Sequence, residues 1–278
     1  MLLQKQLQKE KKMLENLTLL IHSCGAYSDL WSGQVEMLNR HWGKRNIRTV
    51  ILTDTNPMEL SFEGVEIFCA GEGLEITDRL KAFLPTVTTE FVFVTLDDYY
   101  LMKDVDNARI SFLISFMEEK QYSYIRLFND PRGGKLIKEG VYEAIITNKK
   151  NDYYVNLYQG IWRKTFITDT VANTLNAWQY EVSLTPFAIK NNIRCAMTKG
   201  KEYQILDVIR KGKVLHKAHR YFKKDPVYKG NRPIMPLKTE ISLGFKSFLK
   251  RVLPRSLTQR LKRVMIKHGA TFYSPLDE

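Results

Sequence analysis

Two adjacent carboxylates, Asp97 and Asp98, follow the short apolar run Phe91 to Leu96. Neighbouring aspartates repel one another, and neither ionises easily in a protein interior unless a positive charge lies close by. Strand ends in open α/β sheets bind ligands, so we expect the pair at such an end, facing a divalent metal or a polar substrate. A solvated turn or a helix cap is the alternative role for the same acids.

A third carboxylate, Glu181, lies within the aromatic stretch Trp178-Gln179-Tyr180-Glu181. Apolar neighbours raise the pKa of a carboxyl group toward neutrality, and aromatic rings offer stacking faces to a sugar. A carboxylate with a raised pKa suits the work of a general base. A single glutamate in a helix can equally be an ordinary surface residue.

Several stretches resemble motifs of GT-A-type glycosyltransferases. The run Leu96-Asp97-Asp98-Tyr99-Tyr100 is similar to their acidic motif, with the second acid shifted by one place and Tyr99 at the usual third acidic position. Ser23-Cys24-Gly25-Ala26-Tyr27-Ser28-Asp29-Leu30-Trp31 resembles the opening loop of bacterial surface-polysaccharide members, with Gly25 replacing an acid. Gly160-Ile161-Trp162-Arg163 and the later Trp-any-any-Glu stretch also match, so the resemblance covers residues 17–222.

For the acids, the resemblance implies a metal site and a base. Asp98, with Asp97 beside it, would hold Mg²⁺ or Mn²⁺ at the diphosphate of a nucleotide-sugar donor. Asp97 would also contact that donor and take part in catalysis, and Glu181 would deprotonate the acceptor hydroxyl. Because Tyr99 stands where the family has an acid, the need for a metal stays open.

The resemblance also implies residues that bind the donor. Ser23, Tyr27 and Asp29 would lie near the nucleoside, although Asp29 could instead cap the following helix and Tyr27 could simply pack. Asp54, at the end of the second expected strand, could contact the nucleotide or begin a turn. Arg79 is an expected diphosphate contact, and its alternative is an ordinary solvated charge on a helix.

Hydrophobic periodicity predicts the elements that position these residues. Strand, helix and parallel strand alternate in the first half of the chain, which gives right-handed crossovers. The expected class is α/β, a GT-A-like (Rossmann-like) mixed and mostly parallel sheet flanked by helices, with a basic amphipathic helical tail. The expected strands are 17–22, 47–53, 65–70, 91–96, 122–128, 153–161 and 193–197, and the expected helices are 29–42, 76–84, 104–120, 166–175 and one through Glu181 that ends at 190.

We expect three regions, an N-terminal helical extension (1–16), a catalytic domain (17–235) and basic amphipathic helices (236–278). The formal net charge of +13 indicates an anionic partner. Residues 241–268 hold eight Lys or Arg and no Asp or Glu, with apolar residues at helical intervals. This pattern predicts helices that lie on an anionic membrane surface. The alternatives are helices packed on the catalytic domain, or a nucleic-acid interface, which we do not expect because no base-stacking platform is visible.

A basic run before the tail contains His216 and His219, spaced as metal ligands can be, but no third ligand is nearby. With Lys217 and Arg220, this run is expected to form a basic face or to lie near the donor phosphates.

Cys24, Cys69 and Cys195 are widely separated and indicate reduced thiols. Without a signal peptide or a membrane-spanning run, we expect a cytoplasmic protein, peripheral on the inner face of the cell membrane. The expected function is transfer of a sugar from a nucleotide-diphosphate sugar to a hydroxyl of a lipid-linked glycan in surface polysaccharide synthesis. The alternatives are a sugar nucleotidyltransferase and a non-catalytic adaptor that binds membrane or nucleic acid.

Overall fold

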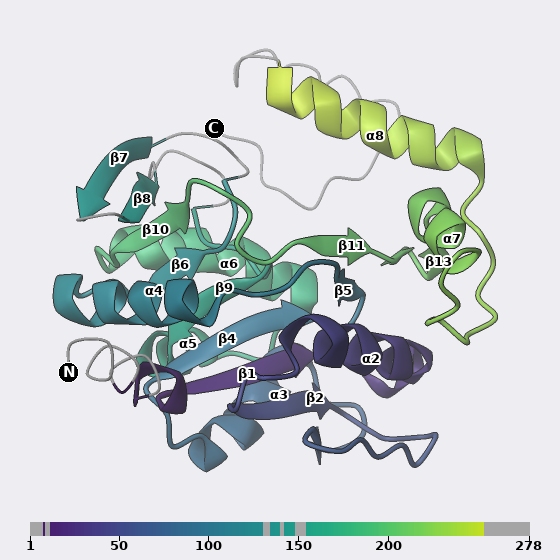
Figure 1. Ribbon diagram of the computed structural model, residues 1–278, viewed down its shortest axis with the longest axis horizontal. Helices are drawn as coiled ribbons and strands as arrows, with labels where there is room; N and C mark the ends of the chain where they lie inside the picture. Colours follow the sequence, from purple (N-terminus) through teal and green to yellow (C-terminus); the bar gives the residue numbers. More distant parts are fainter. Residues whose placement is uncertain (1–7, 9–11, 130–133, 140–141, 148–153, 253–278) are drawn as a thin grey trace.

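The computed structural model describes residues 8, 12–129, 134–139, 142–147 and 154–252 (Figure 1). Its main sheet has nine strands in the order β3-β2-β1-β4-β9-β6-β10-β8-β7. These strands are β1 (Leu17–His22), β2 (Arg48–Thr53), β3 (Glu66–Cys69), β4 (Phe91–Leu96), β6 (Tyr124–Arg126), β7 (Gly134–Glu139), β8 (Tyr142–Thr147), β9 (Gly160–Arg163) and β10 (Cys195–Thr198).

The direction of the strands confirms the predicted class, a mixed and mostly parallel α/β sheet. Strands β3, β2, β1 and β4 pair in parallel. Strand β9 is antiparallel to both β4 and β6, and β6 is parallel to β10. The hairpin of β7 and β8 completes the sheet through an antiparallel pair between β8 and β10. Within the described sheet only β9 and β8 therefore run against the other strands.

Helices cover both faces of the sheet, because its central strands bury side chains on both sides. Leu19 of β1 belongs to one core cluster and Leu20 belongs to the other. The first cluster contains side chains of α2 and α4, and the second contains side chains of α3, α5 and α6. The bounds of these helices are α2 (Trp31–Trp42), α3 (Ile76–Phe83), α4 (Asn107–Lys120), α5 (Lys164–Thr170) and α6 (Ala177–Lys190), with short 3-10 helices η1 (Gly25–Leu30) and η2 (Leu84–Thr86).

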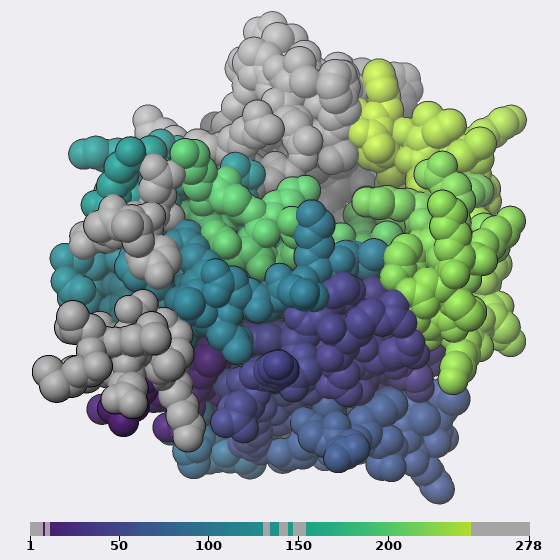
Figure 2. All heavy atoms as spheres, in the orientation of Figure 1, coloured from purple at the N-terminus to yellow at the C-terminus, as the bar shows by residue number. Residues whose placement is uncertain are grey.

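A third apolar cluster joins the two ends of the chain. It packs side chains of η1 and α2 against later elements, with Tyr100 at its centre. Figure 2 shows the same relationship, with the light-green part of the chain resting against the purple N-terminal part. The later elements are β11 (Ile205–Asp207), which pairs with β5 (Tyr99–Leu101), and β12 (Ile209–Arg210), β13 (Lys213–Val214), α7 (His216–Phe222) and α8 (Leu237–Val252).

Some expected elements differ from the structure. The strand expected at 153–161 is wrong, because the strand there is β9, Gly160–Arg163, and the described residues before it, 154–159, form a loop that is buried except at Tyr158. Helix α2 begins at Trp31, and the expected cap Asp29 lies inside η1, where no side chain caps the helix. The hairpin of β7 and β8 and the pair of β5 and β11 were not expected. Local propensity is a weak guide at these places, since short strands form through tertiary pairing.

The expected tail is described only in part. Helix α8 forms the first expected amphipathic segment, and the remainder, 253–278, lies outside the described residues. Of the expected N-terminal helix, residues 12–15 are helical, while most of the remainder lies outside the described part. Among the helices that the structure describes, none combines the length and the apolar character needed to cross a bilayer.

Candidate active site

Strand pairing brings Ser23 and Asp97 together. Strands β1 and β4 are parallel neighbours in which His22 pairs with Leu96, so the residues that follow them meet at the carboxyl edge of the sheet. The Ser23 hydroxyl donates a hydrogen bond to Oδ2 of Asp97, and the Trp31 indole donates to the same hydroxyl at 2.6 Å. Asp97 is 8% exposed, and burial raises its pKa to about 7, against the effect of the hydrogen bonds from Ser23 and Asp98.

Asp98 has a second acidic neighbour that the sequence analysis missed. The backbone N–H of Val208 donates to the carbonyl of Asp98 at 2.9 Å, and Asp207 pairs with Tyr99 across β5 and β11. Burial and the charges of Asp97 and Asp207 raise the pKa of Asp98 well above its ordinary value. Burial also raises the pKa of Asp207, which forms an ion pair of 2.5 Å with Arg210.

The residues present fit a divalent metal that shares its ligands with a substrate. Oδ1 of Asp98 is buried and has no hydrogen-bond partner in the described structure, which leaves a lone pair free for a cation. Within the described ranges no group of three or more His, Cys, Asp or Glu forms a complete metal cage. Mg²⁺ is commonly held by one or two carboxylates together with substrate phosphates, so a complete cage is not required.

Glu181 lies on the first turns of α6, where a capping box fixes the helix start. Asn176 accepts a hydrogen bond from the Gln179 backbone at 3.0 Å, and the Gln179 side chain accepts one from the Asn176 backbone at 3.0 Å. The Glu181 carboxylate accepts a hydrogen bond from the Leu157 N–H at 3.3 Å. Burial raises the pKa of Glu181, with this hydrogen bond acting in the opposite direction.

Tyr99 connects the acid pair with the distant glutamate. Its ring stacks on that of Tyr158, with centroids 5.7 Å apart and planes 14° from parallel. Burial, and after it the neighbouring charges of Tyr158, Asp98, Asp207 and Glu181, raise the pKa of Tyr99. The charges of Asp98 and Glu181 therefore both reach Tyr99, although the two acids lie far apart in the chain.

The loop expected to bind the nucleoside, which contains Tyr27 and Asp29, is held by side chains from residues 228–232. Arg232 forms a two-pronged ion pair with Asp29, through Nε at 2.8 Å and Nη2 at 2.6 Å. Tyr228 donates to Asp29 at 2.9 Å, and the Arg232 guanidinium lies 4.4 Å from the centroid of the Tyr27 ring. Burial acts to raise the pKa of Asp29, but the hydrogen bonds from Arg232 and Tyr228 outweigh it and lower that pKa.

Asp54 and Arg79 lie beside the same loop. Oδ1 of Asp54 accepts hydrogen bonds from the backbone of Gly25 at 2.6 Å and of Thr55 at 2.8 Å, so it holds the ends of β1 and β2 together. Arg79 donates to the Leu74 carbonyl at 2.8 Å. Its charge contributes to lowering the pKa of His22, mainly a burial effect, to about 3.

Of the expected site residues, Ser23, Asp54, Asp97 and Asp98 follow the ends of β1, β2 and β4, Tyr27 and Asp29 lie in η1, and Arg79 and Glu181 lie on α3 and α6. Sequence reasoning missed Tyr158, Asp207, Arg210, Tyr228 and Arg232. Asp207 ends a strand of only three residues and Arg232 lies in an irregular segment, so neither has a periodic signal that identifies it. Tyr158 precedes the Gly160 stretch that was recognised, but its aromatic character alone does not distinguish it from a core residue.

Comparison with known proteins finds similarity in fold only. No protein-family model and no curated protein matches this chain. Residues 1–349 of S. aureus TarS in complex with UDP-GlcNAc match with a TM-score of 0.48 and 16% identity, over 71% of this chain and 60% of that chain. This chain therefore spans less than two thirds of the TarS fragment.

The matches to two further solved structures extend over a larger share of those chains. UDP-glucose pyrophosphorylase complexed with UDP-glucose matches with a TM-score of 0.44 and 12% identity, over 68% of this chain and 92% of that chain. A cytidylyltransferase from Leptospira borgpetersenii serovar Hardjo-bovis matches with a TM-score of 0.41 and 12% identity, over 78% and 98%. All three matches have TM-scores below 0.5 and sequence identities of 16% or less.

Proposed function

We propose that this chain is a glycosyltransferase that moves a sugar from a nucleoside-diphosphate sugar to a hydroxyl of a glycan. The observation that carries the proposal is a path of contacts between the acids: Tyr99, next to Asp98, stacks on Tyr158, and the N–H of the adjacent Leu157 donates to Glu181. An acidic pair at the carboxyl edge of the sheet suits a donor diphosphate, and a half-buried carboxylate at the other end of this path suits an acceptor hydroxyl.

The donor would lie across the ends of β1 and β4. Ser23 keeps Asp97 in place, and Asp98 with its unpaired oxygen would hold Mg²⁺ or Mn²⁺. A divalent ion bound there offsets the charge that develops on the leaving diphosphate. Tyr27 and Asp29 would contact the nucleoside, in a loop that Arg232 holds through its ion pair.

Glu181 would act as the base. Its carboxylate takes the proton of the acceptor hydroxyl while the acceptor oxygen forms a bond to the anomeric carbon. The bond from that carbon to the diphosphate breaks, and the nucleoside diphosphate leaves with the bonding electron pair. A pKa raised by burial improves the match between Glu181 and this proton transfer. The exposed face of Tyr158, 37% exposed and stacked on Tyr99, offers a surface to the sugar ring.

The test compares conservative variants of the two acids. A panel of nucleoside-diphosphate sugars is incubated with the protein, Mg²⁺ or Mn²⁺ and glycan acceptors, and release of nucleoside diphosphate is measured. Asp98→Asn and Glu181→Gln are each expected to abolish transfer, whereas Glu118→Gln, on the exposed side of α4, is expected to retain it. Unchanged turnover in Asp98→Asn or Glu181→Gln removes that residue from the mechanism. Pyrophosphate release from a nucleoside triphosphate and a sugar 1-phosphate would instead identify a nucleotidyltransferase.

We also propose that α8 brings the enzyme to the inner face of the cell membrane, where a lipid-linked glycan would be its acceptor. Leu237, Ile241 and Phe245 recur at intervals of four residues on this helix and are 58%, 62% and 59% exposed. Residues 241–268 add eight Lys or Arg without an acid, which complements anionic lipids. Vesicles with anionic lipid are expected to sediment the full chain, and a chain that ends at residue 240 is expected to stay in solution. Equal sedimentation of both chains would contradict the proposal, as would binding of RNA in preference to vesicles.

A further inference from the structure

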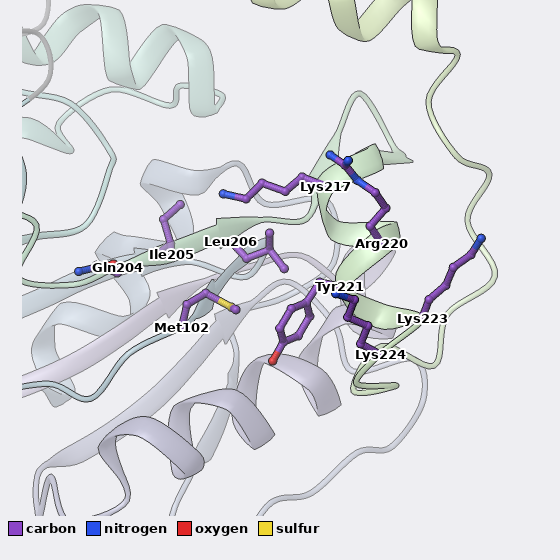
Figure 3. A pocket seen from close by; sticks show the side chains of 9 residues that line it. All are labelled: Met102, Gln204, Ile205, Leu206, Lys217, Arg220, Tyr221, Lys223 and Lys224. Carbon is purple, nitrogen blue, oxygen red and sulfur yellow. The ribbon is translucent and has the colours of Figure 1, made fainter.

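A cavity of about 650 Å³ lies between β11 and α7, to one side of the candidate active site (Figure 3). Its volume falls within the range typical of small-molecule sites. Four of its nine lining residues are cationic, and all four lie on α7 or in the turn that follows it. They are Lys217, Arg220, Lys223 and Lys224. Figure 3 shows Lys217 reaching back from α7 toward Ile205 and Leu206.

The four cations of the cavity have no ion-pair partner within the described part of the chain. In the described part of the chain, Arg40 pairs with Asp225 and Arg210 pairs with Asp207, whereas none of the four cations of the cavity forms an ion pair. Lys217 does lie near enough to Asp207 to lower the pKa of that carboxyl, though burial has the larger and opposite effect. A group of unpaired cations around one cavity attracts an anion, and phosphate is an anion that Arg binds through paired hydrogen bonds and Lys as a point charge.

The remaining lining of the cavity is largely apolar. Met102, Ile205 and Leu206 come from β11 and the end of β5, and the Tyr221 ring closes one side. The Tyr221 hydroxyl is already bound to Asp225, at 2.7 Å, which leaves its ring as the available surface. An inorganic anion would leave these apolar side chains without a partner. An organic phosphate with an apolar group uses both the cations and the apolar wall.

The cavity adjoins both the acid cluster and the helix with exposed apolar side chains. Leu206 lines the cavity, and the next residue of β11, Asp207, belongs to the environment of Asp98. On the other side, the N-terminal residues of α7 and α8 are in contact, since the His216 N–H donates to Glu240 at 3.0 Å. A ligand held here would have its phosphate beside α7, between the candidate reaction centre and the proposed membrane helix.

We propose that this cavity binds a phosphate group attached to an apolar chain, the chemistry of an isoprenyl diphosphate that carries the acceptor glycan. The role of this ligand as acceptor rests on the function proposed above, but the binding itself does not. The cations hold the phosphates, and the first apolar atoms of the chain contact Met102, Ile205 and Leu206.

The test measures binding of farnesyl diphosphate to the full chain by calorimetry, in EDTA so that no metal attracts the diphosphate to Asp98. The double variant Lys217→Ala with Arg220→Ala is expected to weaken this binding by about ten-fold or more, because hydrogen bonds between charged groups are strong. The matched control, Lys44→Ala with Lys190→Ala, removes the same charge at two exposed positions outside the cavity and is expected to bind as the unchanged chain does.

Two companion ligands separate the sources of affinity. Inorganic pyrophosphate and farnesol are both expected to bind more weakly than farnesyl diphosphate, because each lacks one half of the recognised chemistry. Equal binding of farnesyl diphosphate to the unchanged chain and to the cavity variant would overturn the proposal, and so would the absence of binding to both. These binding outcomes do not depend on the proposed function. If the unchanged chain binds farnesyl diphosphate but transfers sugar from none of the donors, the proposed function fails and the binding proposal stands.

Discussion

The Ser23 hydroxyl donates a hydrogen bond to Asp97 across the ends of two parallel strands, and the Trp31 indole holds that hydroxyl from the other side. Asp97 is thereby fixed in a buried position where its pKa rises to about 7. Ionising this buried carboxyl group lowers the free energy of unfolding, by about 1.4 kcal/mol for each unit by which the folded protein raises its pKa.

Asp97→Asn is expected to stabilise the metal-free protein at alkaline pH. Between the ordinary pKa of 3.8 and the native value of about 7, the folded protein keeps a proton on Asp97 that the unfolded chain has lost. The free energy of unfolding therefore falls as the pH rises through this window, by up to about 1.4 kcal/mol per pH unit from this group. Asparagine does not titrate, so the free energy of unfolding of the variant does not fall through this group, and its amide oxygen still accepts the hydrogen bond from Ser23. Urea unfolding in EDTA at pH 5 and pH 8 measures the difference.

The control for this prediction is Asp169→Asn, an exposed aspartate on α5, which is expected to leave the pH dependence unchanged. A stability difference between the Asp97→Asn variant and the unchanged chain that stays constant from pH 5 to pH 8 would show that Asp97 titrates in its ordinary range. The Asp97→Asn variant is also expected to lose transfer activity, so that stability and activity change in opposite directions.

Arg232→Ala is expected to loosen the loop that contains Tyr27 and Asp29, where we propose that the nucleoside binds. Arg232 contributes two hydrogen bonds to Asp29 and one of 2.5 Å to the Ala26 carbonyl, and its side chain is 18% exposed. Removing it leaves Asp29 with Tyr228 alone, so the free energy of unfolding should fall by about 1–3 kcal/mol. Affinity for nucleoside diphosphate, measured by calorimetry, should fall as well if the loop binds the nucleoside.

The matched comparison for that change is Arg40→Ala. Arg40 also pairs with an aspartate, Asp225, but the two side chains are 40% and 29% exposed. Pairs at such a surface contribute about 0–1 kcal/mol. If both variants lose the same stability and neither loses affinity for the nucleotide, then Arg232 is an ordinary surface ion pair and has no part in the loop.

Gly33→Ala is expected to disturb the strand that follows the acid pair. A Cβ atom at Gly33 would lie 2.5 Å from the Tyr100 hydroxyl oxygen and 2.7 Å from a carbon of its ring. Tyr100 is buried and donates to the Leu30 carbonyl at 2.8 Å, so α2 and β5 must move apart to admit the methyl group. Overpacking of this kind costs about 1–3 kcal/mol in the free energy of unfolding. The thermal midpoint should therefore fall.

Gly244→Ala provides the opposite case on α8. No atom lies within 4 Å of the position of its Cβ, and the residue is exposed in a helix. Alanine raises helix stability there by about 0.5–1 kcal/mol. A destabilising Gly33→Ala beside a neutral or stabilising Gly244→Ala is the expected pattern, and equal effects at both positions would contradict the close packing of α2 on β5.

The sequence predicted those parts of the fold that depend on local patterns. The strands at 17–22 and 91–96 begin and end as expected, because both are mainly apolar runs that polar residues follow. Residues whose position depends on distant partners could not be predicted. Arg232 reaches Asp29 only through the packing of an irregular segment, and Asp207 reaches Asp98 only because a three-residue strand pairs with β5.

The transfer rate is expected to fall at low pH through the protonation of Glu181. A base works in its ionised form, and burial raises the pKa of Glu181 above the ordinary value of 4.5, so kcat should decline at a pH above 4.5 as the carboxylate gains its proton. Measuring kcat with saturating donor keeps the proposed donor site at the ends of β1 and β4 occupied, so that the profile reports on groups that remain free in the complex.

Tyr158→Ala tests the assignment of that decline. Tyr158 lies close enough to Glu181 that the charge of the carboxylate contributes, after burial, to raising the tyrosine pKa to about 12. Removing the ring admits water to Glu181, lowers the pKa of its carboxyl group toward 4.5, and should move the decline in kcat to lower pH. The variant Tyr122→Phe, which keeps a buried ring that packs beside α4, is expected to leave the profile in place. A decline that stays at the same pH in Tyr158→Ala would assign the titration to another group and remove Glu181 as the base.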